Sequence, residues 1–290
     1  NSGGGFGAID WQASPSLTVS AGFRVDAWHN EPHDTLTNPR NASAVSPRVG
    51  VSWRSAGGTT LRGSGYSAFR APTLNELYRQ FRVGNVATSA NPDLVEERLW
   101  GAEVGGGWSG PIGGSSATFK VDGTFYWNNL DEAIINATVS ISPKLVSRRR
   151  ENLGSVTARG IEINSSLDFA DHWTISTAYA WLDSFIREAI PGTDPATTVG
   201  NRLPQVPTYR GRATIWYHSD RGWAGSLSIG AIGEQFEDDL NLLTLATAIL
   251  VDTSIEIPVT DSFQVTIRAE NMFNEAVEIR RAPVLTYGAP

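Results

Sequence analysis

The chain has 290 residues, a formal net charge of −7, 18% charged residues, 29 Gly, 10 Trp and no Cys. The lack of Cys excludes disulfides, thiolate metal sites and a Cys nucleophile, and the negative charge gives no electrostatic support for binding a nucleic acid. No apolar run reaches the roughly 20 residues of a transmembrane helix. A soluble β protein, an outer-membrane β-barrel or a part of either remains.

Alternation of apolar and polar residues predicts long strands along the whole chain. After a first segment at 5–12, the apolar residues of the next run share one face and its polar residues share the other, and the same period of two recurs in later segments. The clearest runs are 17–27, 118–128, 160–169, 251–257 and 263–270. Strands of about 10 to 20 residues exceed the usual 5 or 6 of globular proteins and suit a tilted membrane-spanning strand.

The predicted connections alternate between short and long. The short ones are 13–16, 55–58, 109–115, 170–172, 219–222 and 259–262, and the long ones are 29–46, 70–92, 136–144, 188–206 and 237–247. Outer-membrane barrels have short periplasmic turns and longer outer loops. The pattern therefore predicts an all-β fold, an antiparallel up-and-down transmembrane β-barrel of about 12 strands whose first strand descends toward the periplasm.

Tryptophans near the predicted strand ends give a further indication. Trp173 and Trp181 lie on one face of one strand, and a rise of about 3.3 Å per residue at 45° tilt separates them by roughly 19 Å along the membrane normal. This spacing would place one ring at each membrane interface. The alternative is that these rings pack in the core of a sandwich.

The stretch 64–78, SGYSAFRAPTLNELY, interrupts the strand pattern. Pro72 has no N–H for a ladder, so the strand should end near Arg70. Thr73 and Glu76 form a T-x-x-E capping box, which predicts a short helix that begins in LNELYRQF. Leu74, Leu77, Tyr78 and Phe81 would form its apolar stripe. The segment is then either a loop held down by that stripe or a ligand contact.

Charged residues suggest no catalytic site. We expect one polar network to line the barrel lumen; its members are Asp122, Glu162, Asp168, Asp252, Lys120, Arg210, Arg212 and Arg268. The cluster from Arg148 to Glu151 should lie near the barrel mouth as a solvated face, although anionic lipid or substrate could contact it. His29 and His33 are read as part of a solvated loop rather than a metal site, because a full ligand set is lacking.

Five segments carry a resemblance to a known family: FRAPTLNELYRQFRVGN at 69–85, ANPDLVEERLWGAEVG at 90–105, RRRENLGSVTARGIEIN at 148–164, RLPQVPTYR at 202–210 and AENMFNEAVEIRRAPVLTYGAP at 269–290. In this order they resemble the barrel of TonB-dependent outer-membrane receptors. The resemblance runs across nearly the whole chain. Such barrels have about 22 strands and hold an N-terminal plug domain, and no plug, energy-coupling box or closing aromatic strand is visible here.

The resemblance implies that residues 1–290 are the C-terminal part of such a barrel, about 12 of 22 strands, without the plug. It implies a receptor in the bacterial outer membrane for energy-coupled uptake of a scarce large nutrient such as a ferric siderophore or cobalamin. Its partners would be outer-membrane lipid, the nutrient and a TonB-type energy-coupling protein acting through the plug. No enzyme activity, catalytic residue, metal or cofactor is expected. The candidate ligand contacts in the outer loops are Arg70, Asn75, Glu76, Tyr78, Arg79 and Arg82.

Two other functions remain open from the sequence. One is a passive outer-membrane channel of about 12 strands, closed by pairing of segment 5–12 with segment 263–272. The other is a secreted β-rich enzyme or carbohydrate-binding protein, in which Trp side chains would stack on sugars. If the chain is part of a wider barrel, its first and last strands should instead be the edges of an open, curved sheet.

Overall fold

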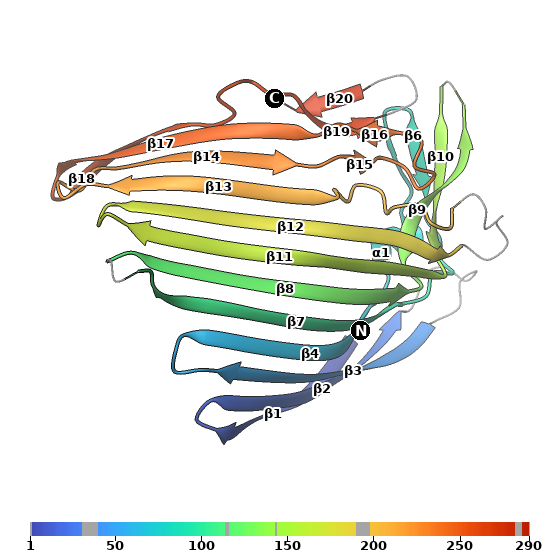
Figure 1. The fold of residues 1–290 in the computed structure, drawn as a ribbon. Helices are drawn as coiled ribbons and strands as arrows, with labels where there is room; N and C mark the ends of the chain where they lie inside the picture. Colours follow the sequence, from blue (N-terminus) through green and yellow to red (C-terminus); the bar gives the residue numbers. More distant parts are fainter. Residues whose placement is uncertain are drawn as a thin grey trace.

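The alternating segments form one long antiparallel sheet in the computed structural model, which describes residues 2–30, 40–113, 116–142, 144–189, 198–281 and 286–289. Twelve strands pair in the order β1-β2-β3-β4-β7-β8-β11-β12-β13-β14-β17-β18, and Figure 1 shows them as a curved arc. Their bounds are β1 (Ser2–Ser14), β2 (Leu17–Asn30), β3 (Arg40–Arg54), β4 (Thr59–Arg70), β7 (Glu97–Pro111), β8 (Thr118–Asp131), β11 (Ser155–Phe169), β12 (Trp173–Glu188), β13 (Tyr209–His218), β14 (Ala224–Ile232), β17 (Ala248–Thr260) and β18 (Phe263–Ala269). The predicted all-β fold is confirmed.

The register joins the apolar positions of neighbouring strands into one continuous surface. Gly63 pairs with Val104, Val104 with Phe125, and Phe125 with Ile161. Directly paired residues point to the same face of a sheet. Val104 is 60% exposed, Phe125 44% and Phe23 56%, so no second sheet within the described part of the chain covers this face. Large apolar side chains left open to the surroundings along a whole sheet are what a lipid-facing barrel wall requires, as the alternation predicted.

Aromatic side chains lie on the apolar face near both ends of the strands. At the short-turn end, the ring of Tyr217 lies 4.8 Å from that of Trp173 and 4.9 Å from that of Trp223. Eight residues farther along β12, Trp181 lies in register with Tyr209, the first residue of β13. This arrangement has the form of two interfacial aromatic girdles.

The opposite face carries the predicted polar network. Arg62 of β4 reaches across β7 to Asp122 of β8, with Nη1–Oδ2 and Nη2–Oδ1 distances of 2.5 and 2.6 Å. The reach is possible because Gly105 of β7 lies between them; a Cβ there would come within 3.0 Å of the Arg62 guanidinium. Further along the arc, Arg212 donates to Asp252 at 3.0 Å. Polar groups satisfied in this way suit a wet lumen better than a dry core.

The long and short connections separate to opposite ends of the strands, as predicted. The turns at 15–16, 55–58, 170–172, 219–223 and 261–262 join neighbouring strands directly. Figure 1 shows these turns on the left, and the long connections, with all the smaller elements, on the right. Among the described residues β1 pairs with β2 and β18 with β17, and no ladder joins β1 to β18. The described strands therefore form an open arc, without a ladder that would close a 12-strand barrel.

Candidate functional site

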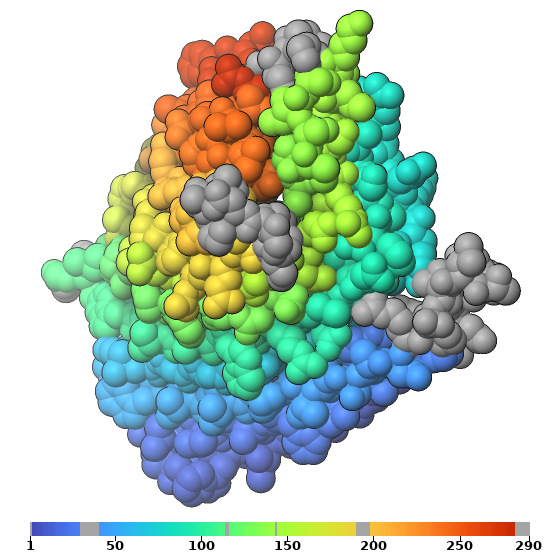
Figure 2. Space-filling view, turned by 90° about the vertical axis from the view of Figure 1, so that its right-hand side faces the viewer, coloured from blue at the N-terminus to red at the C-terminus, as the bar shows by residue number. Residues whose placement is uncertain are grey.

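The long connections build a structured layer that we call the long-loop rim; it consists of the described residues within 71–96, 132–154, 198–208 and 233–247. It contains α1 (Leu74–Tyr78), β5 (Phe81–Val83), β6 (Val86–Ser89), β9 (Ile134–Ile141), β10 (Val146–Asn152), β15 (Gln235–Phe236) and β16 (Thr244–Leu245). A four-stranded sheet, β5-β6-β10-β9, joins the first two connections, and β6 and β10 pair in parallel. Figure 2, which views this rim end-on, shows the described parts of these connections close together.

The predicted capping box is present at the start of α1. Thr73 accepts a hydrogen bond from the Glu76 backbone N–H at 3.3 Å, and Glu76 accepts one from the Thr73 backbone N–H at 2.7 Å. The predicted apolar stripe is wrong, because only Leu77 is buried, whereas Leu74 is 66% exposed and Tyr78 40% exposed. The helix ends after five residues, so it is too short to present a continuous stripe.

Two of the candidate ligand contacts, Arg70 and Glu76, bind each other. Arg70 Nη1 lies 2.9 Å from Glu76 Oε2, and Arg70 Nε donates to Glu97, the first residue of β7. Glu97 is 8% exposed and also accepts from the Ile134 backbone N–H at 2.7 Å. Partial burial disfavours ionisation of Glu76, but hydrogen bonds from Arg70 and Thr73 outweigh it and hold the pKa of Glu76 below its ordinary value.

The other four candidates, Asn75, Tyr78, Arg79 and Arg82, lie on the exposed side of the same connection. The Asn75 carbonyl accepts from the Arg79 backbone N–H at 3.1 Å, and Arg82 Nε donates to the Gly84 carbonyl at 2.9 Å. The structure does not bring these side chains together with the Arg70–Glu76–Glu97 group. They remain open to a ligand approaching the rim.

Two asparagines tie the first two connections together; they lie in segments 90–105 and 148–164, which carry the family resemblance. Asn91 Nδ2 donates to the Arg150 carbonyl at 2.8 Å. Asn152 Oδ1 accepts from the Val95 backbone N–H at 2.9 Å, and its Nδ2 donates to the Val95 carbonyl at 3.1 Å. A side-chain amide can satisfy a backbone donor and a backbone acceptor together, so these asparagines act as cross-links between loops.

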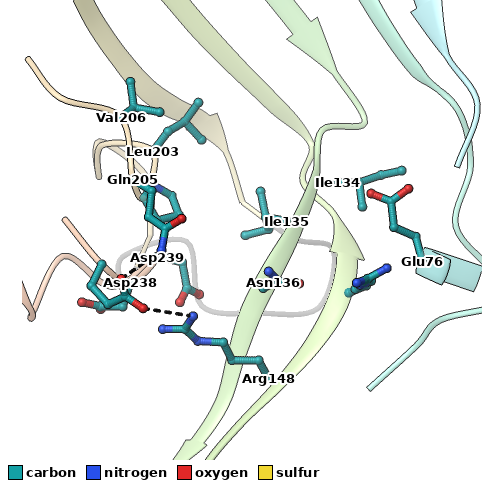
Figure 3. A pocket seen from close by; sticks show the side chains of 13 residues that line it. Glu76, Ile134, Ile135, Asn136, Arg148, Leu203, Gln205, Val206, Asp238 and Asp239 are labelled. Atoms are coloured by element: carbon teal, nitrogen blue, oxygen red, sulfur yellow. Dashed lines mark hydrogen bonds and ion pairs between the residues drawn. The ribbon is translucent and has the colours of Figure 1, made fainter. Parts of the chain in front are cut away.

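A cavity of about 340 Å³ lies within the long-loop rim. Figure 3 shows Glu76 on one side, Gln205, Asp238 and Asp239 on the other, and Asn136 between them. Glu237, Asp238 and Asp239 are 2%, 4% and 2% exposed. Sequence reasoning missed this group, because three consecutive acidic residues in a predicted loop are typical of a solvated surface.

The buried carboxylates are all engaged by neighbouring donors. Asp238 accepts from the backbone N–H groups of Leu240 and Leu243 at 3.0 and 2.7 Å, which folds its own loop. Glu237 accepts from Gln205 Nε2 at 3.0 Å and lies 3.8 Å from Arg148 Nη1. A buried charge is tolerated only with such partners.

The side chains of the cluster from Arg148 to Glu151 lie in different surroundings. The side chain of Arg148 is 12% exposed and that of Arg149 is 47% exposed. Arg148 and Arg150 line the cavity. The prediction of a solvated face is therefore wrong for Arg148, because alternate residues of β10 point to opposite sides of the strand. The sequence could not indicate Glu237 as the partner of Arg148, because this contact depends on the folding of β9 and β10 into a hairpin.

Metal-binding groups do not gather in the described part of the chain, where no set of three His, Asp or Glu side chains has the arrangement of a metal site. His29 shares a hydrogen bond of 2.6 Å with Asn41, and His33 lies outside the described residues. No helix among the described residues is long and apolar enough to cross a membrane.

Comparison with known proteins matches residues 1–272 to the family described as TonB dependent receptor-like, beta-barrel. Similar solved structures include a copper transporter, OprC, at 16% identity and a TM-score of 0.78, over 100% of this chain and 46% of OprC. The siderophore receptor PiuA from Acinetobacter baumannii is 15% identical, with a TM-score of 0.74 over 99% of this chain and 41% of its own.

The ferric yersiniabactin uptake receptor FyuA from Yersinia pestis is 13% identical, with a TM-score of 0.73 over 99% of this chain and 43% of FyuA. At these identities the likeness shows the fold. The chain spans less than half the length of each of these three structures.

Proposed function

The chain belongs to the family of TonB-dependent receptor β-barrels, proteins of the bacterial outer membrane, and we propose that it forms part of the barrel wall and ligand-receiving rim of an uptake receptor. The cargo we propose is a scarce, large nutrient of the metal-complex class, such as a ferric siderophore, with cobalamin as a further candidate. The observation that carries the proposal is the interlocked long-loop rim, with its charged cavity, at one end of a polar-lined arc of lipid-facing strands.

The receptor would bind its cargo at the long-loop rim and make no covalent change to it. Asn75, Tyr78, Arg79 and Arg82 are the exposed contacts that we propose for the cargo, while Arg70 and Glu76 position the loop that carries them. Energy would come from a TonB-type protein acting through a plug domain, and this chain would contribute about 12 of the 22 strands of the barrel. No enzymatic step is proposed.

A passive channel is the second candidate, and it is disfavoured because no ladder joins β1 to β18 among the described residues. An open arc cannot conduct selectively, because its edge strands expose unpaired N–H and C=O groups to the membrane at a cost of several kcal/mol each. A secreted carbohydrate-binding protein is disfavoured because the exposed tryptophans of the sheet, such as Trp100 and Trp127, lie on the apolar face with Val104 and Phe125.

Uptake by whole cells tests the proposal. A strain lacking the complete receptor gene would be complemented and offered labelled ferric siderophores, copper complexes and cobalamin under limitation. We expect uptake of one cargo that stops when the TonB-type protein is deleted. Arg79→Ala with Arg82→Ala should weaken cargo binding, while Arg221→Ala, exposed at the opposite rim, should not. Uptake that continues without energy coupling would instead identify a passive channel.

A further inference from the structure

The long-loop rim consists of two parts that meet along a seam. The first part, formed by α1, β5, β6, β9 and β10, is held together by the four-stranded sheet and by Asn91 and Asn152. The second part, formed by residues 198–208 and 233–247, is held by a different set of bonds. Asn241 accepts from the Arg202 N–H at 2.7 Å and donates to the Arg202 carbonyl at 2.9 Å, and the Gln205 N–H donates to the Phe236 carbonyl at 2.6 Å.

The 340 Å³ cavity lies on this seam, since its lining comes from both parts. Ile134, Ile135 and Asn136 line it from β9, and residues 203–206 and 237–239 line it from the second part (Figure 3). A cavity means that the two parts do not interdigitate there, because packed protein interfaces leave few voids larger than a water molecule. Little dispersion energy therefore holds the two parts together at this place.

Polar contacts hold the seam instead. Asp239 Oδ2 accepts from the Thr138 backbone N–H at 3.0 Å, and its Oδ1 accepts from the Thr138 hydroxyl at 2.5 Å. Arg148 and Glu237 form a longer ion pair at 3.8 Å. Asp239 is 2% exposed, so its two bonds to β9 are shielded from competing water.

An apolar cluster marks the fixed base of the seam. Ala133, Leu153, Val156 and Ile186 are at most 3% exposed, and Ile135 from the first part and Leu203 from the second both pack against them. Thr138 lies three residues beyond Ile135 on β9, about 10 Å farther along the strand. The seam thus has an apolar hinge at one end and a polar closure farther out.

A bridge after the sheet spans both parts as well. In β19 (Val277–Arg281), Arg280 Nη2 donates to the Val83 carbonyl of the first part at 2.9 Å. Arg281 Nη1 donates to the Thr244 carbonyl of the second part at 2.8 Å. These bonds to backbone carbonyls can be exchanged for water without leaving a buried charge, which is not true of Asp239.

We infer that the long-loop rim opens along this seam, with the Asp239–Thr138 contact as the latch that holds it closed. Opening would separate the β9–β10 hairpin from residues 233–247 about the apolar base and widen the cavity. The proposed function enters only in what the opening serves, namely access of the cargo to the lumen. Asp239 is in this account a positioning residue, since it acts on the placement of two loops.

Distance measurement between spin labels tests the latch. This chain has no Cys, so Val139→Cys and Leu242→Cys, at positions 66% and 67% exposed on the two sides of the seam, can be labelled in the complete receptor in bilayers. The labelled receptor that keeps Asp239 and Thr138 should give a single short distance between the two labels. Asp239→Asn and Thr138→Val should each raise the population with the longer distance about tenfold, because losing one hydrogen bond to a charged group shifts an equilibrium by about a factor of ten.

Ser140→Ala, at an exposed position of β9, is the control and should leave the distance unchanged. Unchanged distances in both latch variants, or an equal shift in the control, would overturn the latch. If Asp239→Asn does not fold, Thr138→Val alone decides, because it keeps the buried carboxylate and the backbone bond.

Cross-linking the two cysteines separates the latch from the proposed function. We expect a short thiol-reactive linker to stop cargo uptake and its cleavage to restore uptake, while either single-cysteine receptor transports normally. Normal uptake by the cross-linked receptor would show that the seam need not open. If the unlinked receptor takes up none of the cargoes, the proposed function fails, and the distance measurement still decides whether the latch exists.

Discussion

Arg70 and Glu76 form an ion pair of 2.9 Å between Nη1 and Oε2 at the point where a membrane-type strand becomes a helix. Because Arg70 also donates to Glu97, a single guanidinium joins the end of β4, the start of α1 and the start of β7. The fork of an arginine can hold two carboxylates at fixed angles. Arg70 and Glu76, which the sequence suggests as ligand contacts, thus set the geometry of the loop that carries the other candidate contacts.

Glu97→Ala should loosen the first two connections of the long-loop rim. Glu97 is 8% exposed, and its loss leaves the Ile134 N–H without its acceptor and removes one of the two carboxylates that bind Arg70. We expect the free energy of opening at Ile134 to fall by about 1.5–3 kcal/mol, the range for hydrogen bonds to a charged group. Amide hydrogen exchange of residues 132–136 measures it. Glu256→Ala, at a partly exposed carboxylate of the distant β17, should change it by less than about 0.5 kcal/mol.

The stability of α1 should depend on acid through Glu76. The folded pKa of Glu76 is lowered from 4.5, so its carboxylate stabilises the folded helix fully above that value. This contribution should disappear as the pH falls through the lower folded pKa. The protection factors of the amides of residues 74–79, which compare the exchange rate with that of an unfolded chain at the same pH, should therefore fall below pH 4.5 in the wild type. Glu76→Gln should exchange faster at neutral pH and lack this pH-dependent step; an identical profile in the variant would assign the acid response to another group.

A positive charge should cost much more stability at one of two adjacent residues of β11 than at the other. Ile163 is 41% exposed on the apolar face, whereas Asn164 pairs with Asp122 on the polar face. Ile163→Arg should lower the unfolding free energy in bilayers by about 2–4 kcal/mol if the site is near the membrane midplane. Asn164→Arg, next to a carboxylate and water, should cost much less. Equilibrium unfolding of the complete receptor in lipid compares them, and equal costs would argue against a lipid-facing apolar surface.

Gly160 should not tolerate a methyl group. A Cβ there would collide with the Trp181 carbonyl and the Tyr126 hydroxyl, and would come within 2.6 Å of Tyr126 Cζ. Gly160→Ala should therefore cost about 1–3 kcal/mol, the usual cost of overpacking. Gly230 lies on the same polar face, and the nearest atom to its Cβ would be 3.8 Å away. Gly230→Ala should be nearly neutral, and thermal unfolding of the complete receptor compares the two variants.

The strands could be predicted because their signal is local. Val104, Phe125 and Ile161 alternate with polar neighbours along each strand, and the register that aligns them follows from keeping all apolar groups on one face. The capping box of Thr73 and Glu76 is also local, since its partners are three residues apart.

The rim depends on contacts between distant segments. Asp239 meets Thr138 across 101 positions of the chain, and Asn152 meets Val95 across 57. No period in the sequence indicates that residues 134–152 form a hairpin, or that β10 pairs in parallel with β6. Leu74 and Tyr78 were misjudged because an apolar stripe needs a surface to cover, and a helix of five residues offers only Leu77 to it.

The orientation of the strands across the outer membrane is tested most directly by cysteine labelling of the complete receptor in intact cells. Leu242→Cys lies in the long-loop rim and Arg221→Cys in the turn between β13 and β14, and both positions are exposed. A thiol reagent that cannot cross the outer membrane should label Cys at position 242 in intact cells, and at position 221 only after the membrane is permeabilised. Labelling of position 221 but not 242 in intact cells would contradict a receptor that presents its long-loop rim to the outside.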